Sequence, residues 1–428
     1  MVSNSPNLVL ARQLDSSDEL SSFRDKFHIP QHNGSDCLYF TGNSLGLQPR
    51  SASDALKTEL DDWAIHGVEG HFKARNPWMH YHELFSTHLS KLAGTLPSEV
   101  VAMNALTVNL HLLLVSFYRP KGNRKKILCE AKAFPSDRYA LLSQIDFHDG
   151  NPDLDLIELE PREGEHCLRL EDIEKAIFDI GEELATVMIG GVNYYTGQLH
   201  DLKSITSAAH KVGATCGFDL AHGMGNVPFE LHNWNVDFAC WCSYKYMNSG
   251  PGAVSGIYVH ERHHNSGIPR LEGWWGHEKS SRFKMDPNYV SMGTAESWQM
   301  SNAPVLNMAV HKASLEIFEE AGGINKLRER SLRLTAFLEK IVREVAYSTD
   351  VNLEIITPSS PEKRGAQLSI IAHGQGRDLY DRLSSQGVVV DWREPDVIRM
   401  APVPLYNSFE DIARFGIILE EALINPRT

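Results

Sequence analysis

Short apolar runs alternate with amphipathic stretches through the middle of the chain. Apolar runs bounded by turn residues are typical of buried strands, whereas a spacing near 3.6 residues is typical of helices. The pattern predicts strands over 100–103, 126–130, 186–192, 215–219, 236–242 and 252–260, with helices over 108–118, 136–144 and 201–212. Such alternation predicts a mainly parallel sheet with helices on both faces, an α/β fold.

The pattern changes after about residue 305. A helix over 303–321 is followed by Gly322 and Gly323, and then by a second helix with one apolar face. Strands are expected over 353–356, 367–372, 388–392 and 397–400, and helices over 378–386 and from Ser408 to about 423. Ser408 is the expected N-cap of the last helix. This order of elements predicts a smaller α+β lobe.

Three parts of the chain are therefore expected. Residues 1–60 form an N-terminal segment, with a helical start and a turn-rich stretch over 42–46, that packs with the small domain. Residues 61–305 form the large domain, and residues 306–428 form the C-terminal small domain. A chain of 428 residues is long enough for one large domain and one smaller domain.

Composition and charge restrict the class of protein. Hydrophobic residues at 42% and charged residues at 22% are ordinary for a soluble globular enzyme. The formal net charge of −14 argues against binding to nucleic acid or to an anionic membrane surface. The longest apolar run, 110–118, is too short to cross a bilayer, and residues 1–20 lack the apolar core of a signal peptide. A cytoplasmic enzyme is expected.

The six cysteines are scattered along the chain, and only Cys240 and Cys242 are close together. A lone C-x-C pair lacks the second half of a zinc site, and both thiols would face one side of a strand. Buried free thiols are therefore expected, with no metal and no disulfide. Free thiols fit a reducing compartment.

A lysine and an acid follow two of the predicted strands. Lys245 comes after the apolar run 236–242 and before a loop of small residues, and Asp219 ends the strand 215–219. A lysine amine can form a Schiff base with the aldehyde of pyridoxal phosphate (PLP), and a carboxylate can hold the pyridine nitrogen protonated. On these residues alone, an exposed lysine is an equal alternative. A dinucleotide site is less favoured, because no G-x-G-x-x-G motif opens a helix.

Longer motifs identify a family. The chain resembles the kynureninases, PLP enzymes of the aspartate aminotransferase fold type in the class V aminotransferase superfamily. The resemblance covers nearly the whole chain. Its motifs are Thr41–Leu47, Met103–His111, Glu130–Asp137, Tyr194–Gln198, Gly217–His222, Phe238–Gly252, Gly273–Glu278 and Arg399–Phe409.

The resemblance implies a fold and a reaction. The fold is the PLP-dependent transferase fold type I, with a mainly parallel sheet between helices in the large domain and a smaller α+β domain. The reaction is hydrolytic cleavage of the Cβ–Cγ bond of L-kynurenine or L-3-hydroxykynurenine. Its products are anthranilate or 3-hydroxyanthranilate and L-alanine, in tryptophan catabolism and de novo NAD biosynthesis. The resemblance also implies a homodimer with shared active sites.

The same resemblance implies which residues bind the cofactor. Lys245 forms the Schiff base, Asp219 pairs with the pyridine nitrogen, and the Tyr244 hydroxyl reaches the phosphate and is a candidate donor to a developing oxyanion; these three are the expected catalytic residues. The remaining cofactor-binding candidates are Leu106, Thr107, Phe134, Pro135, Ser136, Asp137, His222, Trp274 and Asn302. Leu106 and Thr107 would hold the phosphate at a helix N-terminus, and Phe134 would stack on the ring.

Simpler interpretations of four of these residues stay open. On the residues alone, the helix N-cap is the favoured interpretation of Thr107, and Phe134 can be a core aromatic residue. Asp137 is equally an acid in the first turn of a helix, and His222 a structural histidine.

The substrate-binding candidates are Ser44, His71, Ser301, Asn302 and Arg399. Arg399 resembles the arginine that binds the α-carboxylate, which its planar fork suits; the alternative is a surface salt bridge. His71, Ser301 and Asn302 resemble the residues around the aromatic ring of the substrate. Their pattern is similar to that of the eukaryotic enzymes, which favour the 3-hydroxylated substrate.

Two other functions remain open. One is a different reaction on the same scaffold, such as transamination or cysteine desulfuration, the latter requiring a nucleophilic cysteine in a mobile loop. The other is a non-enzymatic protein of this fold, whose expected sign is a missing lysine or acid. The base that activates the water molecule is not assigned by any motif.

Overall fold

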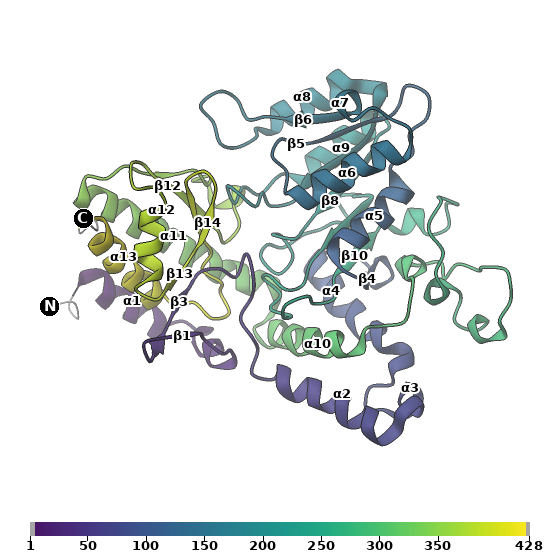
Figure 1. Ribbon diagram of the computed structural model, residues 1–428, viewed down its shortest axis with the longest axis horizontal. Helices are drawn as coiled ribbons and strands as arrows, with labels where there is room; N and C mark the ends of the chain where they lie inside the picture. The colour runs from purple at the N-terminus through teal and green to yellow at the C-terminus, as the bar shows by residue number, and fades with distance from the viewer. Residues whose placement is uncertain (1–4, 425–428) are drawn as a thin grey trace.

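The computed structural model describes residues 5–424, which form a large and a small lobe (Figure 1). The large lobe contains a seven-stranded sheet in the order β4-β10-β9-β8-β7-β5-β6. Its strands are β4 Val100–Ala102, β5 Lys126–Glu130, β6 Leu156–Leu159, β7 Leu184–Gly190, β8 Thr215–Asp219, β9 Phe238–Trp241 and β10 Gly256–Val259. β10 is antiparallel to both of its neighbours, and the other pairs are parallel. The prediction of a mainly parallel sheet is confirmed.

Helices cover both faces of this sheet (Figure 1). The side chain of Ile127 belongs to an apolar cluster with residues of α5 and α6, whereas its neighbour Leu128 belongs to a second cluster with residues of α4, α8 and α9. Successive residues of a strand point to opposite faces, so the clusters are the two halves of the core. The helices are α4 Ser86–Ala93, α5 Leu106–Phe117, α6 Pro135–Phe147, α7 Pro152–Asp155, α8 Leu170–Ile180 and α9 Leu202–Lys211.

Three further helices complete the large lobe. They are α2 Ala52–His66, α3 Gly70–Lys73 and α10 Val305–Glu320. α2 packs along α10 at the edge of the molecule, and α3 continues from it (Figure 1). Residues 261–298 contain only short 3-10 turns, at Glu261–His263, Trp274–Gly276, Arg282–Lys284 and Ala295–Trp298.

The small lobe is built on an antiparallel sheet in the order β11-β12-β15-β14. Its strands are β11 Leu353–Ile355, β12 Leu368–Ala372, β14 Asp391–Arg393 and β15 Val397–Met400. The helices are α1 Pro6–Ser16, α11 Gly323–Thr349, α12 Gly376–Ser384 and α13 Phe409–Ile424. Leu8 of α1 and Phe40 after β3 (Leu38–Tyr39) belong to the same apolar core as these elements. β1 Gln31–His32 and β2 Ser35–Asp36 form a separate hairpin.

Several predicted elements have the bounds that the pattern indicated. The strands over 126–130, 215–219 and 397–400 are confirmed to the residue. The cap of the last helix is also confirmed, because the Ser408 hydroxyl accepts the Asp411 N–H at 2.9 Å and the Asp411 carboxylate accepts the Ser408 N–H at 3.1 Å. The prediction of a single strand over 388–392 is wrong. The segment forms two strands: β13 Val388–Val389, which pairs with β3, and β14, which pairs with β15.

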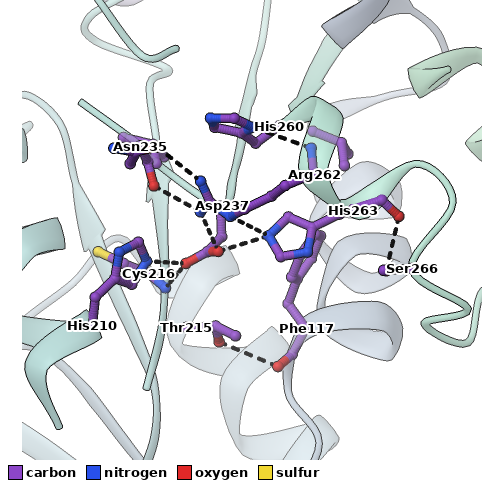
Figure 2. A network of polar contacts seen from close by, with 12 residues as sticks. Phe117, His210, Thr215, Cys216, Asn235, Asp237, His260, Arg262, His263 and Ser266 are labelled. Carbon is purple, nitrogen blue, oxygen red and sulfur yellow. Dashed lines mark hydrogen bonds and ion pairs between the residues drawn. The ribbon is translucent and has the colours of Figure 1, made fainter. Parts of the chain in front are cut away.

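A buried carboxylate ties together the amino-terminal ends of the strands. Asp237, directly before β9, accepts hydrogen bonds from His210 of α9 (2.8 Å), His263 (2.7 Å), Arg262 (2.5 Å) and the Cys216 N–H of β8 (2.7 Å) (Figure 2). Burial alone would raise the pKa of Asp237, but the hydrogen bonds from His210 and His263 outweigh it and lower the pKa. Both carboxylate oxygens of Asp237 accept hydrogen bonds from the protein, which indicates a structural role for this edge of the sheet.

All six cysteines are free, and all but Cys167 are buried, as expected from their strand-like surroundings. Among residues 5–424, no helix is both long and apolar enough to cross a membrane. The division at residues 60 and 305 stays a prediction. The packing of α1 on α13 supports a link between the N-terminal segment and the small lobe, while Met308 and Leu315 of α10 lie in the core of the large lobe.

Candidate active site

A pocket of about 260 Å³ lies at the carboxyl edge of the large sheet, opposite Asp237. The chain reaches it after β4, β5, β7, β8 and β9, where open α/β sheets bind their ligands. The lining residues are Ala105, Leu106, Thr107, Glu130, Phe134, Ser136, Asp137, Gly190, Val192, Tyr194, Asp219, Ala221, His222, Tyr244 and Lys245. Nine residues predicted from the sequence are in this set: Leu106, Thr107, Phe134, Ser136, Asp137, Asp219, His222, Tyr244 and Lys245.

The N-terminus of α5 forms one wall of the pocket. Asn104, in the left-handed conformation at φ 49°, turns the chain out of β4, and Ala105 is the N-cap. Thr107 is therefore the second residue of the helix, and its alternative interpretation as the N-cap is wrong. The first-turn amides have no partner within the helix and carry its positive dipole end, so they suit a phosphate group.

Two carboxyl groups face each other on the floor of the pocket. Asp219, at the end of β8, accepts the Ala221 N–H at 2.7 Å, and Asp137 lies in the first turn of α6. Burial raises the pKa of both groups, and for Asp137 the charge of Asp219 raises it further. A hydrogen bond between them raises the pKa of Asp137 and opposes the rise at Asp219. These opposite effects favour Asp137 as the donor of the hydrogen bond, and the positive charge of Lys245 also opposes the rise at Asp219, which favours Asp219 as the carboxylate of the pair.

Lys245 lies in the loop after β9. This strand pairs with β8, which ends at Asp219. Its Nζ is 5.7 Å from the centre of the Phe134 ring and 5.9 Å from that of the Tyr244 ring. Burial, and after it the positive charge of Lys245, lowers the pKa of His222, so this imidazole is neutral. The alternative of an exposed lysine on a solvated surface is wrong, since Lys245 lines the pocket.

These residues fit pyridoxal phosphate. Phe134 remains 40% exposed and presents an apolar face to the pocket, and the buried Nδ1 of His222 has no partner among the described residues. A helix N-terminus for a phosphate, an ionisable carboxylate for a ring nitrogen and an amine for an aldehyde all line one cavity.

Arg399 of β15 lies behind the pocket. Its Nη1 donates to the backbone oxygen of Tyr194 at 2.5 Å, and its Nη2 is paired with Asp391. Only 1% of its side chain is exposed, so the alternative of a surface salt bridge is wrong. Tyr194 itself lines the pocket and packs edge-on against Phe134 at 5.3 Å. Arg399 and Lys245 are thus separated by two aromatic rings.

A short segment, residues 40–46, joins the two lobes beside this site. Its first residue, Phe40, accepts the Ala401 N–H at 2.8 Å, two residues after Arg399. Its last residue, Gly46, donates to the Tyr244 oxygen at 2.8 Å, next to Lys245. A Cβ atom on Gly46 would lie 2.3 Å from the Lys245 oxygen, so only glycine allows this approach.

Other predicted residues lie outside the pocket of the single chain. Pro135 is the exposed first residue of α6, and Ser44 is exposed in residues 40–46; neither lines the pocket. The rest are distributed over α3 and the region 274–302: His71, Trp274, Ser301 and Asn302. The His71 ring packs edge-on against Trp78, and 49% of Trp274 is exposed. Their roles stay predictions.

Sequence reasoning did not single out Glu130, Val192 or Tyr194 as lining residues. Burial raises the pKa of Glu130 to about 7, and its carboxylate accepts the Gly190 N–H at 2.9 Å. Glu130 ends β5 just as Asp219 ends β8, so its place after a predicted strand was the available signal.

Comparison with known sequences gives consistent matches. Residues 327–419 match the family model of the kynureninase C-terminal domain. The kynureninase of Flavobacterium psychrophilum is 55% identical over 97% of this chain and 98% of its own length. The kynureninase of Flavobacterium johnsoniae is 54% identical over 97% of both chains, and that of Myxococcus xanthus is 52% identical over 96% of both.

Comparison with solved structures gives the fold. A cysteine desulfurase from Escherichia coli superposes with a TM-score of 0.76 at 16% identity, over 95% of this chain and 99% of that one. A cystine C–S lyase variant, with glycine covalently linked to its PLP cofactor, superposes with a TM-score of 0.75 at 15% identity, over 89% and 97%. The fold is that of the PLP-dependent class V aminotransferases, as predicted.

Proposed function

Because the chain belongs to the kynureninase family, we propose that this pocket cleaves L-kynurenine or L-3-hydroxykynurenine, with Lys245 and Asp219 as its reactive pair. The reaction is a hydrolysis of the Cβ–Cγ bond that yields L-alanine and anthranilate or 3-hydroxyanthranilate, a step of tryptophan catabolism and NAD biosynthesis. The observation that carries the residue assignment is the position of Lys245 and Asp219 on neighbouring strand ends in one pocket.

The described residues hold the cofactor in this proposal. Pyridoxal phosphate supplies an aldehyde that bonds to an amine and a ring that accepts an electron pair. Lys245 provides the amine, and the α5 N-terminus with Tyr244 receives the phosphate. Asp219 pairs with the ring nitrogen and is kept ionised by the proton-bearing Asp137. Phe134 and the neutral His222 bound the ring and exclude water.

The same residues act on the substrate. Once its amine is free, Lys245 Nζ removes the proton from the substrate Cα and holds it for return. The Tyr244 hydroxyl donates a hydrogen bond to the oxygen that becomes negatively charged when water adds to the γ-carbonyl. Burial raises the pKa of this hydroxyl, so it keeps its proton. Arg399 receives the α-carboxylate.

One assay tests this function. Protein loaded with pyridoxal phosphate is incubated with L-kynurenine and, separately, L-3-hydroxykynurenine, and L-alanine and the aromatic amine are quantified. L-Cysteine with detection of sulfide, and L-alanine with a keto acid, test the two alternative reactions. Desulfuration is disfavoured because, within residues 5–424, no cysteine lines the pocket. Sulfide release without cleavage of either kynurenine would contradict the proposal.

The Arg399→Lys variant should raise the KM for kynurenine about tenfold or more, with a smaller change in kcat. A point charge replaces a planar fork, so the carboxylate loses one of two parallel hydrogen bonds in the ground state and transition state alike. Steady-state kinetics measure this effect. A fall in kcat at unchanged KM would show that Arg399 does not bind the carboxylate.

We further propose a homodimer, as the resemblance implies. The α2–α3 face, defined as Trp63, Ile65, Val68 and Phe72, leaves these side chains 60–76% exposed around His71. An apolar patch of this kind is typical of an interface. A second copy covering it would account for the position of His71 and Trp274 outside the pocket of their own chain. The free thiols support a cytoplasmic location.

The double variant Ile65→Glu/Phe72→Glu should sediment as a monomer and lose most of its activity, because two charges cannot be buried without partners. Sedimentation velocity measures the change. Tyr347→Glu on α11, at a side chain that is 93% exposed, is the matched control and should stay dimeric. A double variant that remains dimeric would place the interface elsewhere.

A further inference from the structure

Arg399 belongs to a three-residue ionic cluster at the edge of the small sheet. Asp391 of β14 stands directly opposite Arg399 of β15 in the antiparallel register. The Asp391 carboxylate is paired with Arg399 and also accepts a hydrogen bond from Arg393 Nη2 at 3.1 Å. Arg393 lies two residues after Asp391, so both side chains are on one face of β14.

The cluster carries one carboxylate for two guanidinium groups and therefore has a net charge of about +1. The side chains of Arg399, Asp391 and Arg393 are 1%, 13% and 36% exposed, so solvent screens the charge of Arg399 weakly and that of Arg393 more strongly. The Nε of Arg399 and the Nε of Arg393 are both buried and have no hydrogen-bond partner within residues 5–424. The two unpaired Nε–H donors and the net positive charge can therefore bind one more anion.

The cluster lies against the pocket. Arg399 Nη1 donates to the backbone oxygen of Tyr194, a lining residue, and its guanidinium is 5.9 Å from the Tyr194 ring. The positive charges of Arg399 and Arg393 both contribute to the lowered pKa of the lining residue His222, after burial and the charge of Lys245. The electrostatic potential of both cations therefore extends into the pocket.

We propose that Asp391 is a positioning residue, which shares its carboxylate between Arg393 and Arg399 and thereby fixes the Arg399 guanidinium for the substrate α-carboxylate. This inference rests on the proposed function. A long arginine side chain loses considerable rotamer entropy on binding, and a fixed partner removes that cost beforehand. Without the carboxylate, the buried Arg399 and the partly exposed Arg393 would repel each other, and Arg399 would leave its orientation.

The test compares Asp391→Asn with a matched variant, Asp18→Asn. Asp18 and Arg330 form another buried ion pair, with side chains 4% and 3% exposed and Nε 2.6 Å from Oδ2, but neither lines the pocket. Asp391→Asn should raise the KM for kynurenine about tenfold with kcat nearly unchanged, the size expected for one charge-assisted hydrogen bond. Asp391→Glu should recover part of this loss. Asp18→Asn should lower thermal stability and leave the KM unchanged.

Two more measurements separate positioning from a general structural effect. Calorimetric titration of the loaded protein with L-alanine should show a similarly weaker affinity in Asp391→Asn, whereas ethylamine, which lacks the carboxylate, should show no difference. In an Arg399→Lys background, Asp391→Asn should change the KM less than twofold, because both act through one group.

Three results would overturn the inference. Asp391→Asn could match Asp18→Asn in KM and L-alanine affinity, its effect could add fully to that of Arg399→Lys, or its KM could fall. A fall would mean that Asp391 competes with the substrate. If Asp391→Asn does not fold, the KM of Asp391→Glu, which moves the charge by one methylene, decides between the same outcomes. Wild-type protein without kynurenine turnover would refute the proposed function, whereas the L-alanine titration would still test Asp391.

Discussion

The Lys245→Ala variant should lose at least about 10⁴-fold in kcat and retain the fold. The amine of Lys245 has two tasks in the proposed reaction, since it bonds to the cofactor aldehyde and then carries the substrate Cα proton. No other lysine lines the pocket within residues 5–424, so no neighbour can replace it. Single-turnover kinetics with L-kynurenine measure the loss.

Two controls define the result for Lys245. Lys211→Ala, on the exposed end of α9 at the opposite edge of the sheet, should leave kcat unchanged. Borohydride reduction of the loaded wild-type protein, followed by peptide mass analysis, should attach the cofactor to Lys245 and to no other residue. Turnover by Lys245→Ala above a tenth of the wild-type rate would remove this lysine from the mechanism.

The Asp219→Asn variant should lose about 10³-fold in kcat. An amide cannot keep a ring nitrogen protonated in a buried site, so the ring would accept the electron pair from Cα less readily. Asp137→Asn is the matched control. Because Asp137 is assigned as the hydrogen-bond donor of the pair, an amide there can still donate to Asp219, and the loss should stay within about tenfold.

Steady-state kinetics of the two aspartate variants test whether Asp219 and Asp137 have separate roles. Equal losses in Asp219→Asn and Asp137→Asn would mean that the two carboxyl groups act as one unit and that the assignment of separate roles is wrong. A larger loss in Asp137→Asn would exchange the roles.

The large sheet and most of the pocket could be predicted from the sequence, because strand ends are marked by local patterns. The apolar runs that end at Glu130 and Asp219 are short and buried on both faces, so their hydrophobicity alone locates the carboxyl edge. Leu106 and Lys245 each follow such a run within a few residues. Their convergence then follows from the parallel topology.

Contacts between distant strands could not be predicted in the same way. The run 388–392 is uniformly apolar until Asp391, and the break between β13 and β14 arises because each pairs with a different partner. The register that places Asp391 opposite Arg399 depends on that break, so no periodicity could reveal it. Tyr194 lies in a loop, and its backbone oxygen accepts hydrogen bonds from Arg399 and Gln367 of the distant small lobe.

In the proposed function, the segment of residues 40–46 sets the distance between the residues that hold the two ends of the substrate. It is hydrogen-bonded to the strand of Arg399 at one end and to the loop of Lys245 at the other. The segment is only seven residues long, and its last residue, Gly46, lies against the Lys245 backbone. It therefore limits the distance between Arg399, the proposed carboxylate-binding residue, and the Lys245 amine. The same seven residues therefore tie the position of the small lobe to that of the Lys245 backbone.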